Sequence, residues 1–452
     1  MDTRRAPAGP GASAEPAAAL RTLDALGLVL GIVIGAGIFR APPVVAANAT
    51  GAGPILAAWL LGGLVSLAGA ACYAELATTY PHAGGDYHFL RRALGQAPAF
   101  LFAWARLTVI PTGSIALLAF VFGDYAAALV GAPRASAPFA ALLVAALTIL
   151  NAVGLRVACR AQNVLAAALV AGLLVVIAVG FLLPPAASAP APAPARPAFG
   201  LAMVFVLLAY GGWNEAAYVS AELRGGRRAI VTVLVLSLAI VTALYVLTNA
   251  AYLRGLGLGG VRASSAVASD LLSRALGRAG GAAIGLLVCA AVTTSANATL
   301  LMGSRLVYAF GRDFAPFASL GRWSRRAGSP VNAILLQGGI ALVLVGFGAL
   351  SRRGFEAMVA YTAPVFWLFF LLTGISLFVL RRRDPAAARP FRTPLYPLTP
   401  LVFCATCAFL LWSSLAYAGP GALAGVAVLA TGIVPWWLSA RRTPSARRTA
   451  AA

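Results

Sequence analysis

The sequence predicts an all-α polytopic membrane protein with about twelve transmembrane helices. Composition is the first reason: of 452 residues, 61% are hydrophobic and only 10% are charged, and the mean hydropathy is +0.89. A soluble domain is usually about 45–50% apolar and about 25% charged. The second reason is the recurrence of apolar runs of about 20 residues, the length that crosses a bilayer as a helix.

The apolar runs follow one another along almost the whole chain. We place them at residues 23–49, 53–78, 98–130, 138–154, 161–183, 199–221, 229–253, 280–308, 331–350, 355–380, 398–418 and 421–439. Residues 1–22 are polar and rich in proline and glycine, which predicts a disordered N-terminal segment without a secretory signal. A single transmembrane domain is expected at 23–440, followed by a short tail at 441–452.

The arginines indicate how the chain crosses the membrane. All 34 basic residues are arginine, and the net charge is +22. If the N-terminus is cytoplasmic, arginines in cytoplasmic segments outnumber those in outer loops three to one. The positive-inside rule then places both termini in the cytoplasm of a cell whose plasma (inner) membrane holds the chain. The arginines are not clustered on one solvated face, so we expect no nucleic-acid partner.

The five cysteines predict no special chemistry. They are Cys72, Cys159, Cys289, Cys404 and Cys407, and all lie in or beside apolar runs. Cysteine within a membrane helix behaves as a small apolar residue. We therefore expect no metal site, no disulfide framework and no enzymatic activity.

Glycines interrupt two of the apolar runs near the middle. The stretches are GIVIGAGIF (31–39) and AYGGWN (209–214), and a Pro/Ala-rich linker at 183–199 separates the two halves that contain them. Glycine weakens a helix by about 1 kcal/mol relative to alanine. Backbone groups freed at this depth have to face protein or a polar cavity. Matching interruptions in two halves of a chain are typical of a transporter binding site.

The two breaks would offer backbone groups of both polarities. The half-helix that starts after Gly37 has free N–H groups and the positive end of its dipole, which suits a carboxylate. The half-helices that end near Val33 and Ile34, and near Leu208 and Ala209, have free carbonyl groups, which suit an ammonium group. Together they predict a receptor for a zwitterionic α-amino acid.

Helix packing is the alternative explanation for some of these glycines. Gly27, Gly31 and Gly35 are spaced by four residues and form two overlapping GxxxG units. Gly37 lies off that face. We therefore assign packing to Gly27 and Gly31, and a functional break to Gly35, Ala36 and Gly37.

Several motifs resemble one transporter family. GIVIGAGIF is similar to the first-span signature of the amino acid–polyamine–organocation (APC) superfamily, and AYGGWN resembles the sixth span of its L-type amino acid transporter branch. Further similar stretches are YAELATTYPHAGGDYHFLRRALG (73–95), SRLVYAFGRD (304–313), SPVNA (329–333) and RPFRTPLYP (389–397). The resemblance implies a LeuT-type fold with broken helices 1 and 6 and amino acid transport by alternating access. It also implies inverted five-helix repeats at 23–183 and 199–380, with two extra helices at 398–439.

The resemblance implies a set of substrate-binding residues. They are Val33, Gly35, Ala36, Gly37 and Ile38 in the first span, and Leu208, Gly211, Trp213 and Asn214 in the sixth. For Trp213, packing inside the protein is the alternative. Many family members carry a large aromatic residue at the Leu208 position, so leucine suggests a looser or differently sized pocket.

Two departures from the family concern coupling and partners. Leu169 stands where many members carry a lysine linked to proton coupling or to mimicking a bound cation, which argues against lysine-based coupling. We expect no cofactor besides a coupling proton or sodium ion. The loop at 130–139 lacks the cysteine that joins eukaryotic members to a glycoprotein, so no disulfide-linked heavy-chain partner is expected.

Polar residues within the spans are candidates for coupling or gating, namely Arg40, Glu215, Thr294 and Ser295. Arg40 could pair with Glu215, select an anionic side chain, or simply reach the outer interface. Glu215 could contact substrate, carry a proton, or stabilise its helix start. Thr294 and Ser295 could ligate sodium with first-span carbonyls, or bond to their own helix.

The sequence therefore predicts an amino acid permease that works by symport or exchange. Sodium coupling, transport of related amines, and a non-transporting amino-acid sensor on the same fold remain alternatives. A channel is disfavoured, because channels need a continuous polar lining.

Overall fold

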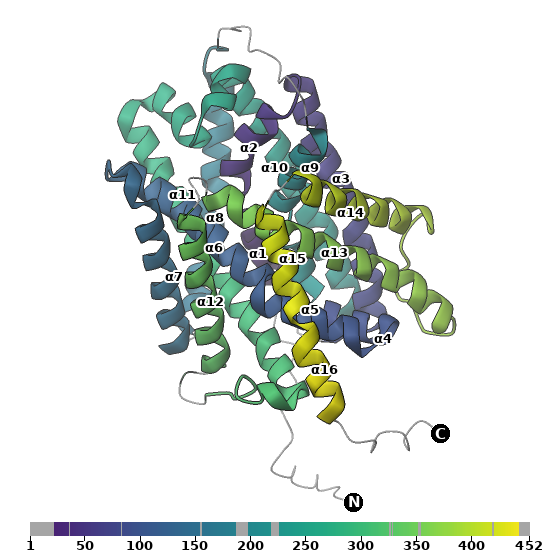
Figure 1. Cartoon of the computed structure of the whole chain (residues 1–452). Coiled ribbons are helices and arrows are strands. Elements are labelled where there is room, and N and C mark those ends of the chain that lie inside the picture. The colour runs from purple at the N-terminus through teal and green to yellow at the C-terminus, as the bar shows by residue number, and fades with distance from the viewer. Residues whose placement is uncertain are drawn as a thin grey trace, which may run out of the picture.

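The computed structural model describes residues 22–35, 37–82, 84–153, 156–186, 198–217, 226–324, 327, 329–350, 354–417 and 420–442. The α-helices are α1 Thr22–Val33, α2 Gly37–Ala47, α3 Ala52–Thr79, α4 Asp86–Leu94, α5 Gln96–Thr108, α6 Ile110–Leu129, α7 Ser136–Val153, α8 Arg156–Leu182, α9 Phe199–Ala209, α10 Gly226–Ala263, α11 Val267–Asp313, α12 Val331–Ala349, α13 Gly354–Arg383, α14 Leu398–Tyr417, α15 Pro420–Thr431 and α16 Ile433–Arg442. Short 3-10 helices are η1 Pro133–Ala135, η2 Trp213–Ala217 and η3 Ala315–Phe317. The all-α prediction is confirmed (Figure 1).

The helices account for every predicted membrane span. Within the described residues, nine helical segments are long and apolar enough to cross a membrane. Two shorter apolar segments, Ala167–Leu182 and Phe199–Glu215, match two further predicted runs. The remaining run is the pair α1 and α2, which a break divides into helices of 12 and 11 residues. The chain is therefore a multi-pass membrane protein.

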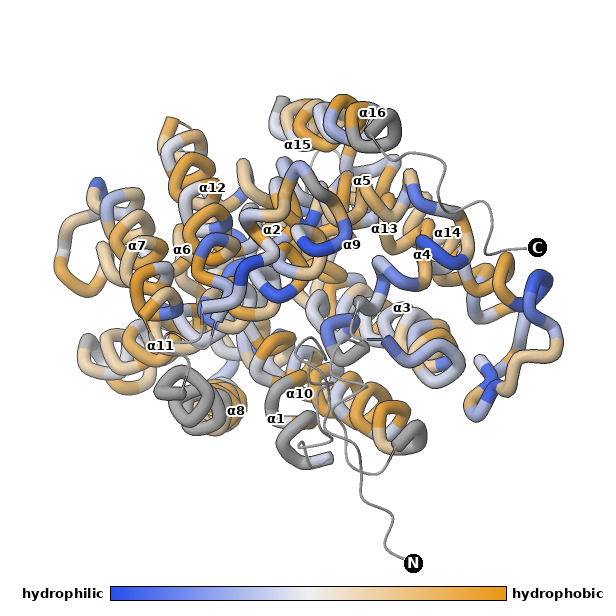
Figure 2. The backbone as a smooth tube through the Cα atoms, turned by 90° about the horizontal axis from the view of Figure 1, so that it is seen from below, coloured by the Kyte–Doolittle hydropathy of each residue, from blue (hydrophilic) through white to orange (hydrophobic). Residues whose placement is uncertain are grey.

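The peripheral helices present apolar side chains to the outside. Leu142 and Ile149 on α7 are 63% and 62% exposed, and Val343 on α12 is 72% exposed. Figure 2 shows α7, α12 and α15 as mostly hydrophobic segments at the edge of the bundle. A soluble monomer rarely exposes so extensive an apolar surface. We infer that these faces contact lipid tails.

The connecting segments gather at two opposite ends of the spans, as alternate crossing requires. At one end, Arg92 on α4 pairs with Asp384, which follows α13, with a nitrogen–oxygen distance of 3.0 Å. At the other end, Arg40 on α2 donates a 2.6 Å hydrogen bond to the carbonyl of Ser265, between α10 and α11. Segments predicted to lie on one side of the membrane thus contact each other.

The predicted span at 98–130 corresponds to one apolar segment, Gln96–Leu129, but its helix is interrupted. It consists of α5, which ends at Thr108, and α6, which begins at Ile110. Pro111 is the physical cause, because proline has no N–H to donate to the carbonyl of Leu107 and its ring crowds that carbonyl. The interruption leaves Arg106 and Ile110 beside the centre of the molecule.

Two other spans are longer than predicted. The α10 helix continues to Ala263, and α11 starts at Val267. Each contains a glycine with a positive φ, Gly257 at 70° and Gly277 at 66°, where the helix direction changes. The proposed five-helix repeat boundaries stay a prediction.

Candidate functional site

Two helices are interrupted where the sequence places its central glycines. The α1 helix ends at Val33, and α9 ends at Ala209. After each end a tight turn replaces the regular helix hydrogen bonds. The Gly35 N–H donates to the Val33 carbonyl at 2.8 Å, and the Gly211 N–H donates to the Leu208 carbonyl at 3.0 Å. The chain resumes in α2 and η2.

The two interruptions touch each other, and this contact requires glycine. A Cβ atom added to Gly37 would lie 2.4 Å from Cβ of Ala209. Gly212 has φ of 107°, and an added Cβ would lie 2.6 Å from Cγ2 of Ile32. By contrast, no atom of the described residues lies within 4 Å of a Cβ added to Gly27, so they provide no close packing contact for that residue.

A tyrosine from a third helix joins the interruptions. The hydroxyl of Tyr245 on α10 lies 2.8 Å from the carbonyl oxygen of Val33 and 3.1 Å from that of Ala209. Its single hydrogen is shared between these two acceptors. The ring is fully buried and packs edge-on against Trp59, with 5.5 Å between ring centroids. Sequence reasoning missed Tyr245, because an apolar run with one tyrosine does not reveal what the hydroxyl contacts.

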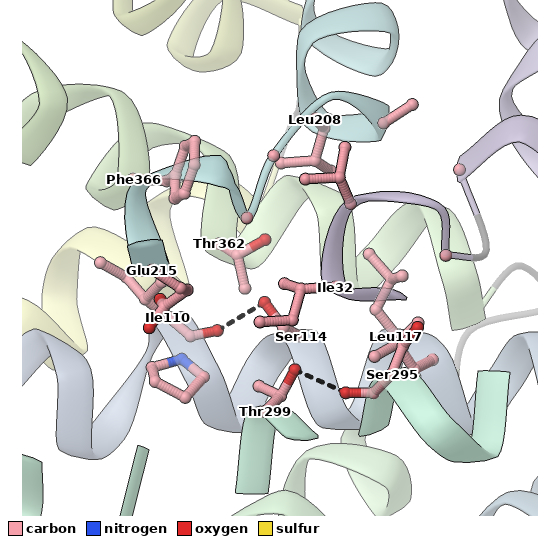
Figure 3. A pocket seen from close by; sticks show the side chains of 18 of the residues that line it. Ile32, Ile110, Ser114, Leu117, Leu208, Glu215, Ser295, Thr299, Thr362 and Phe366 are labelled. Carbon is pink, nitrogen blue, oxygen red and sulfur yellow. Dashed lines mark hydrogen bonds between the residues drawn. The ribbon is translucent and has the colours of Figure 1, made fainter. Parts of the chain in front are cut away.

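A cavity of about 150 Å³ lies beside the interruptions (Figure 3). Its lining combines exposed backbone, aliphatic and aromatic side chains, several hydroxyls and one ion pair. The lining residues are Ile32, Val33, Gly35, Gly37, Ala41, Arg106, Ile110, Pro111, Ser114, Leu117, Leu118, Phe205, Leu208, Ala209, Gly211, Gly212, Asn214, Glu215, Ser295, Ala298, Thr299, Met302, Phe355, Thr362 and Phe366.

Most of the predicted site residues meet at this cavity. Those that line it are Val33, Gly35, Gly37, Leu208, Gly211, Asn214, Glu215 and Ser295. Ile38, Trp213, Arg40 and Thr294 lie outside its lining, and Ala36 lies outside the described residues. The roles of all these residues in substrate binding stay predictions.

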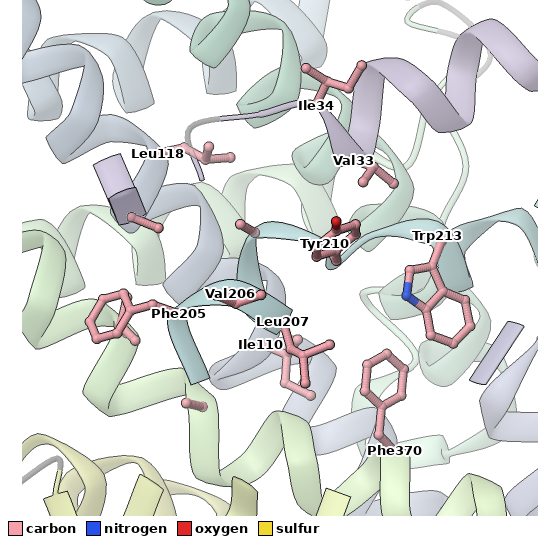
Figure 4. Packing of buried hydrophobic residues seen from close by; sticks show 14 of the residues in the cluster. Val33, Ile34, Ile110, Leu118, Phe205, Val206, Leu207, Tyr210, Trp213 and Phe370 are labelled. Carbon is pink, nitrogen blue, oxygen red and sulfur yellow. The ribbon is translucent and has the colours of Figure 1, made fainter. Parts of the chain in front are cut away.

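Trp213 packs among aromatic side chains. Its ring stacks on Phe370, with centroids 5.5 Å apart and an interplanar angle of 9° (Figure 4). Tyr73 meets it edge-on at 5.1 Å. Trp213 is 3% exposed. This geometry matches the packing alternative for Trp213.

The predicted pairing of Arg40 with Glu215 is wrong. Glu215 accepts two hydrogen bonds from Arg106 on α5, at 2.8 and 3.3 Å. Arg40 instead pairs with Asp124 on α6 at 3.2 Å, and also donates to the Ser265 carbonyl. The physical reason is direction, because α2 runs from its break toward one end of the spans and η2 runs toward the other.

The hydroxyls of α11 divide into two kinds. Thr293 and Thr294 donate to carbonyls four residues earlier in their own helix, at 2.7 and 2.9 Å. Ser295 instead donates to the carbonyl of Gly31 in α1, at 3.3 Å. Only this hydroxyl of the three therefore joins α11 to the first interrupted helix. In the described part of the chain, no group of three or more His, Cys, Asp or Glu side chains could hold a metal ion.

Several lining residues were not predicted. Ile110 and Ser114 come from α6, and Thr362 and Phe366 come from α13. Pro111 was a usable signal, because a proline inside an apolar run can open the helix. No comparable local signal marks the α13 residues, which reach the cavity only through tertiary packing.

Multiple membrane-crossing helices, two of them interrupted at a shared central cavity, define a polytopic membrane permease. The chain belongs to the amino acid permease family, because the family model described as amino acid permease matches residues 20–436. The resemblance inferred from the motifs is thereby confirmed. The protein is therefore a membrane amino acid transporter and not an enzyme.

Named relatives support the same assignment. The b(0,+)-type amino acid transporter 1 of Mus musculus is 30% identical over 386 residues, covering 83% of this chain and 78% of the relative. The cystine/glutamate transporter of Homo sapiens is 28% identical over 431 residues, covering 92% and 84%. The large neutral amino acids transporter small subunit 2 of Mus musculus is 28% identical over 434 residues, covering 92% and 80%.

Proposed function

We propose that this permease moves α-amino acids by alternating access and binds them in the cavity between the two interrupted helices. The observation that carries the proposal is the lining, which includes backbone of both interruptions at Gly35, Gly37, Gly211 and Gly212. Irregular backbone at membrane depth is tolerated where it lines a cavity or is buried in protein. The printed names of the relatives, all amino acid transporters, support the same substrate class.

The unwound backbone recognises the amino and carboxyl groups in this proposal. The substrate carboxylate binds N–H groups at the start of α2, near Gly37, where the helix dipole favours negative charge. The ammonium group binds carbonyls at the ends of α1 and α9. The carbonyls of Val33 and Ala209 already accept from Tyr245, so the ammonium either uses a second lone pair or displaces that hydroxyl.

Energy coupling is proposed to proceed without the family's lysine. Leu169 on α8 is 2% exposed and has no titratable group. Exchange of amino acids, or symport with a proton or sodium ion, are the modes we propose. The Ser295 hydroxyl and the Gly31 carbonyl support sodium, whereas the Glu215 carboxylate beside the cavity supports a proton.

The proposed setting is the plasma (inner) membrane with both termini in the cytoplasm. Its support is the threefold excess of arginine in the segments assigned to the inside. We also propose that no disulfide-linked heavy chain is required. The described cysteines, Cys72, Cys289, Cys404 and Cys407, are free and buried or half-buried, which disfavours a bond to another protein.

Purified protein in liposomes tests the proposal. Labelled amino acids are offered with a proton gradient, with a sodium gradient, or with internal amino acid, and uptake is compared with empty liposomes. We expect uptake of at least one amino acid under at least one condition. If no amino acid or amine moves under any condition, transport is refuted, and binding without flux would favour the sensor alternative.

A matched pair of variants locates the transport site. Ser114→Phe places a bulky ring in the cavity lining and is expected to reduce uptake at least about tenfold. Val343→Phe makes the same kind of addition on the exposed face of α12 and should leave uptake near the wild-type rate. Equal uptake by both variants would contradict this cavity as the binding site.

A further inference from the structure

The central cavity contains a buried ion pair. Arg106 on α5 approaches Glu215 on η2 through both guanidinium NH groups, at 2.8 and 3.3 Å. The side chains are 7% and 16% exposed. A two-bond arginine–carboxylate pair of this kind is both strong and directional.

The pair dominates the electrostatics of the cavity. Among the described residues that line the central cavity, Arg106 and Glu215 are the only charged ones. Their partners in the lining are apolar groups, hydroxyls and one amide. Asp86 of α4 lines a smaller adjoining cavity together with Arg106, and its carboxylate accepts a 3.1 Å hydrogen bond from Thr373.

The pair lies at the partition between these two cavities. Arg106, Ile110, Asn214 and Phe366 line both of them. Figure 3 shows Glu215 near Ile110 and Phe366, while Ser295 lies across the cavity. A substrate whose amino and carboxyl groups occupy the helix interruptions leaves its side chain to the remaining lining, of which the ion pair is part.

We propose that the Arg106–Glu215 pair makes the cavity selective for amino acids with uncharged side chains. This inference rests on the proposed transport function. A neutral side chain leaves the pair intact. A charged side chain has to displace one partner, which leaves a buried charge unpaired, or has to be buried unpaired itself. The volume of about 150 Å³ adds a size limit, since a cavity of about that volume holds a molecule the size of benzene.

Removing one partner of the pair should let the cavity accept substrate side chains whose charge is opposite to that of the remaining partner. In Arg106→Gln the Glu215 carboxylate is released, and it can then pair with the cationic side chain of lysine or arginine. In Glu215→Gln the Arg106 guanidinium loses its two bonds to Glu215 and can contact an acidic side chain instead. The second gain should be smaller, because the carboxylate of Asp86 lines the adjoining cavity beside Arg106.

Transport ratios test the proposal. Wild type, Arg106→Gln, Glu215→Gln and the double variant are placed in liposomes, and uptake of labelled alanine, leucine, lysine and glutamate is measured. We expect the lysine-to-leucine ratio to rise at least tenfold in Arg106→Gln, and the glutamate-to-leucine ratio to rise in Glu215→Gln. The double variant has no charge to unmask and should keep a neutral preference. Arg92→Gln, which breaks an ion pair outside the cavity, should leave both ratios unchanged.

Ligand-induced thermal stabilisation of the wild type gives a second measurement, which stands even if a single variant does not fold. Alanine or leucine should raise the melting temperature, and lysine or glutamate should not. The proposal is overturned if the wild type takes up or binds charged amino acids as well as neutral ones, or if folded single variants keep the wild-type ratios. Absence of all uptake and binding in the wild type would instead refute the proposed transport function.

Discussion

The contact between the two interruptions depends on a few atoms. The Tyr245 hydroxyl is the clearest case, because it is buried and lies within hydrogen-bonding distance of carbonyls from both α1 and α9. Loss of a hydrogen-bond partner for a buried polar group costs about 1–3 kcal/mol. We expect Tyr245→Phe to lower stability by about this amount, measured as a lower melting temperature in detergent.

Tyr252 provides the matched control on the same helix. It is also fully buried, but its hydroxyl has no hydrogen-bond partner among the described residues. Tyr252→Phe should therefore leave the melting temperature unchanged or raise it. Equal destabilisation by the two variants would show that the Tyr245 hydroxyl does not hold the interruptions together.

Gly37 lies at a close approach between the interruptions, against Ala209. In Gly37→Ala the new methyl group would have to push against Ala209, only 2.4 Å from its Cβ. Such overpacking costs about 1–3 kcal/mol. Gly27→Ala is the control, since its added methyl group meets no atom of the described residues within 4 Å and should stabilise α1 slightly. A melting temperature that falls for Gly27→Ala and not for Gly37→Ala would contradict the predicted contact.

For individual residues, the sequence predicts where the backbone is interrupted better than it predicts which side chains pair. Glycines within apolar runs are visible as local weak points, so Gly37 and Gly211 could be placed at the site. The partner of Glu215 could not, because Arg106 is 109 residues away in the chain. Arg40 was as plausible a partner from position alone, and only the directions of α2 and η2 decide between them.

The sequence predicts the presence of a membrane helix better than it predicts whether that helix is continuous. A run of about 20 apolar residues is sufficient to predict a span. It does not predict the interruption at Val109, because membrane helices tolerate proline when neighbouring groups satisfy the freed backbone. Here the Tyr361 hydroxyl donates to the Thr108 carbonyl at 3.0 Å, a contact made by a distant helix.

A stacked histidine pair lies outside the predicted spans, with His88 on the short helix α4 and His82 in the loop before it. The rings of His82 and His88 lie 4.3 Å apart and nearly parallel, at 7°. Burial, and then electrostatic interactions with His82, Arg92 and Arg91, lower the pKa of His88 from 6.5 to about 4. The folded protein thus keeps His88 neutral in the range where the unfolded chain binds a proton.

This lowered pKa gives stability a definite pH dependence. The contribution of neutral His88 is complete above pH 6.5 and decreases as the pH falls from 6.5 toward about 4. His88→Asn removes this titration, so its melting temperature should fall less than that of wild type between pH 7 and pH 4.5. His82→Asn removes one of the secondary causes and should give an intermediate dependence.

Titration of the neighbouring Asp384 carboxylate should not contribute to the pH dependence measured between pH 7 and pH 4.5. Hydrogen bonds from Arg92 and Tyr80 lower the pKa of Asp384 below its usual value. Its contribution is therefore kept above about pH 3.9 and lost only at lower pH, outside the measured range. Identical pH profiles for wild type and His88→Asn would contradict the assignment of the pH dependence to His88.

At the scale of the whole molecule, the ion pairs other than the central Arg106–Glu215 pair lie, with the loop contacts, at two ends of the bundle. The Arg92–Asp384 pair holds one end, and Arg40 with Asp124 and Ser265 holds the other. The sequence predicts two such ends from the alternate crossing of its spans, and the arginine counts predict which end is cytoplasmic. Contacts between loops support it independently, because segments assigned to the same side are the ones that meet.

Cysteine labelling in intact bacterial cells would determine which end faces outward. Ala263, at the end of α10, is exposed and assigned to the outside, whereas Ala386, after α13, is exposed and assigned to the cytoplasm. A membrane-impermeant maleimide should label Ala263→Cys in intact cells, and should label Ala386→Cys only after the cells are opened. The wild-type protein measures the background labelling of the native cysteines. The expectation follows because arginine-rich loops are retained on the cytoplasmic side. The reverse pattern would invert the orientation and place both termini outside, and labelling of both in intact cells would contradict a single fixed orientation.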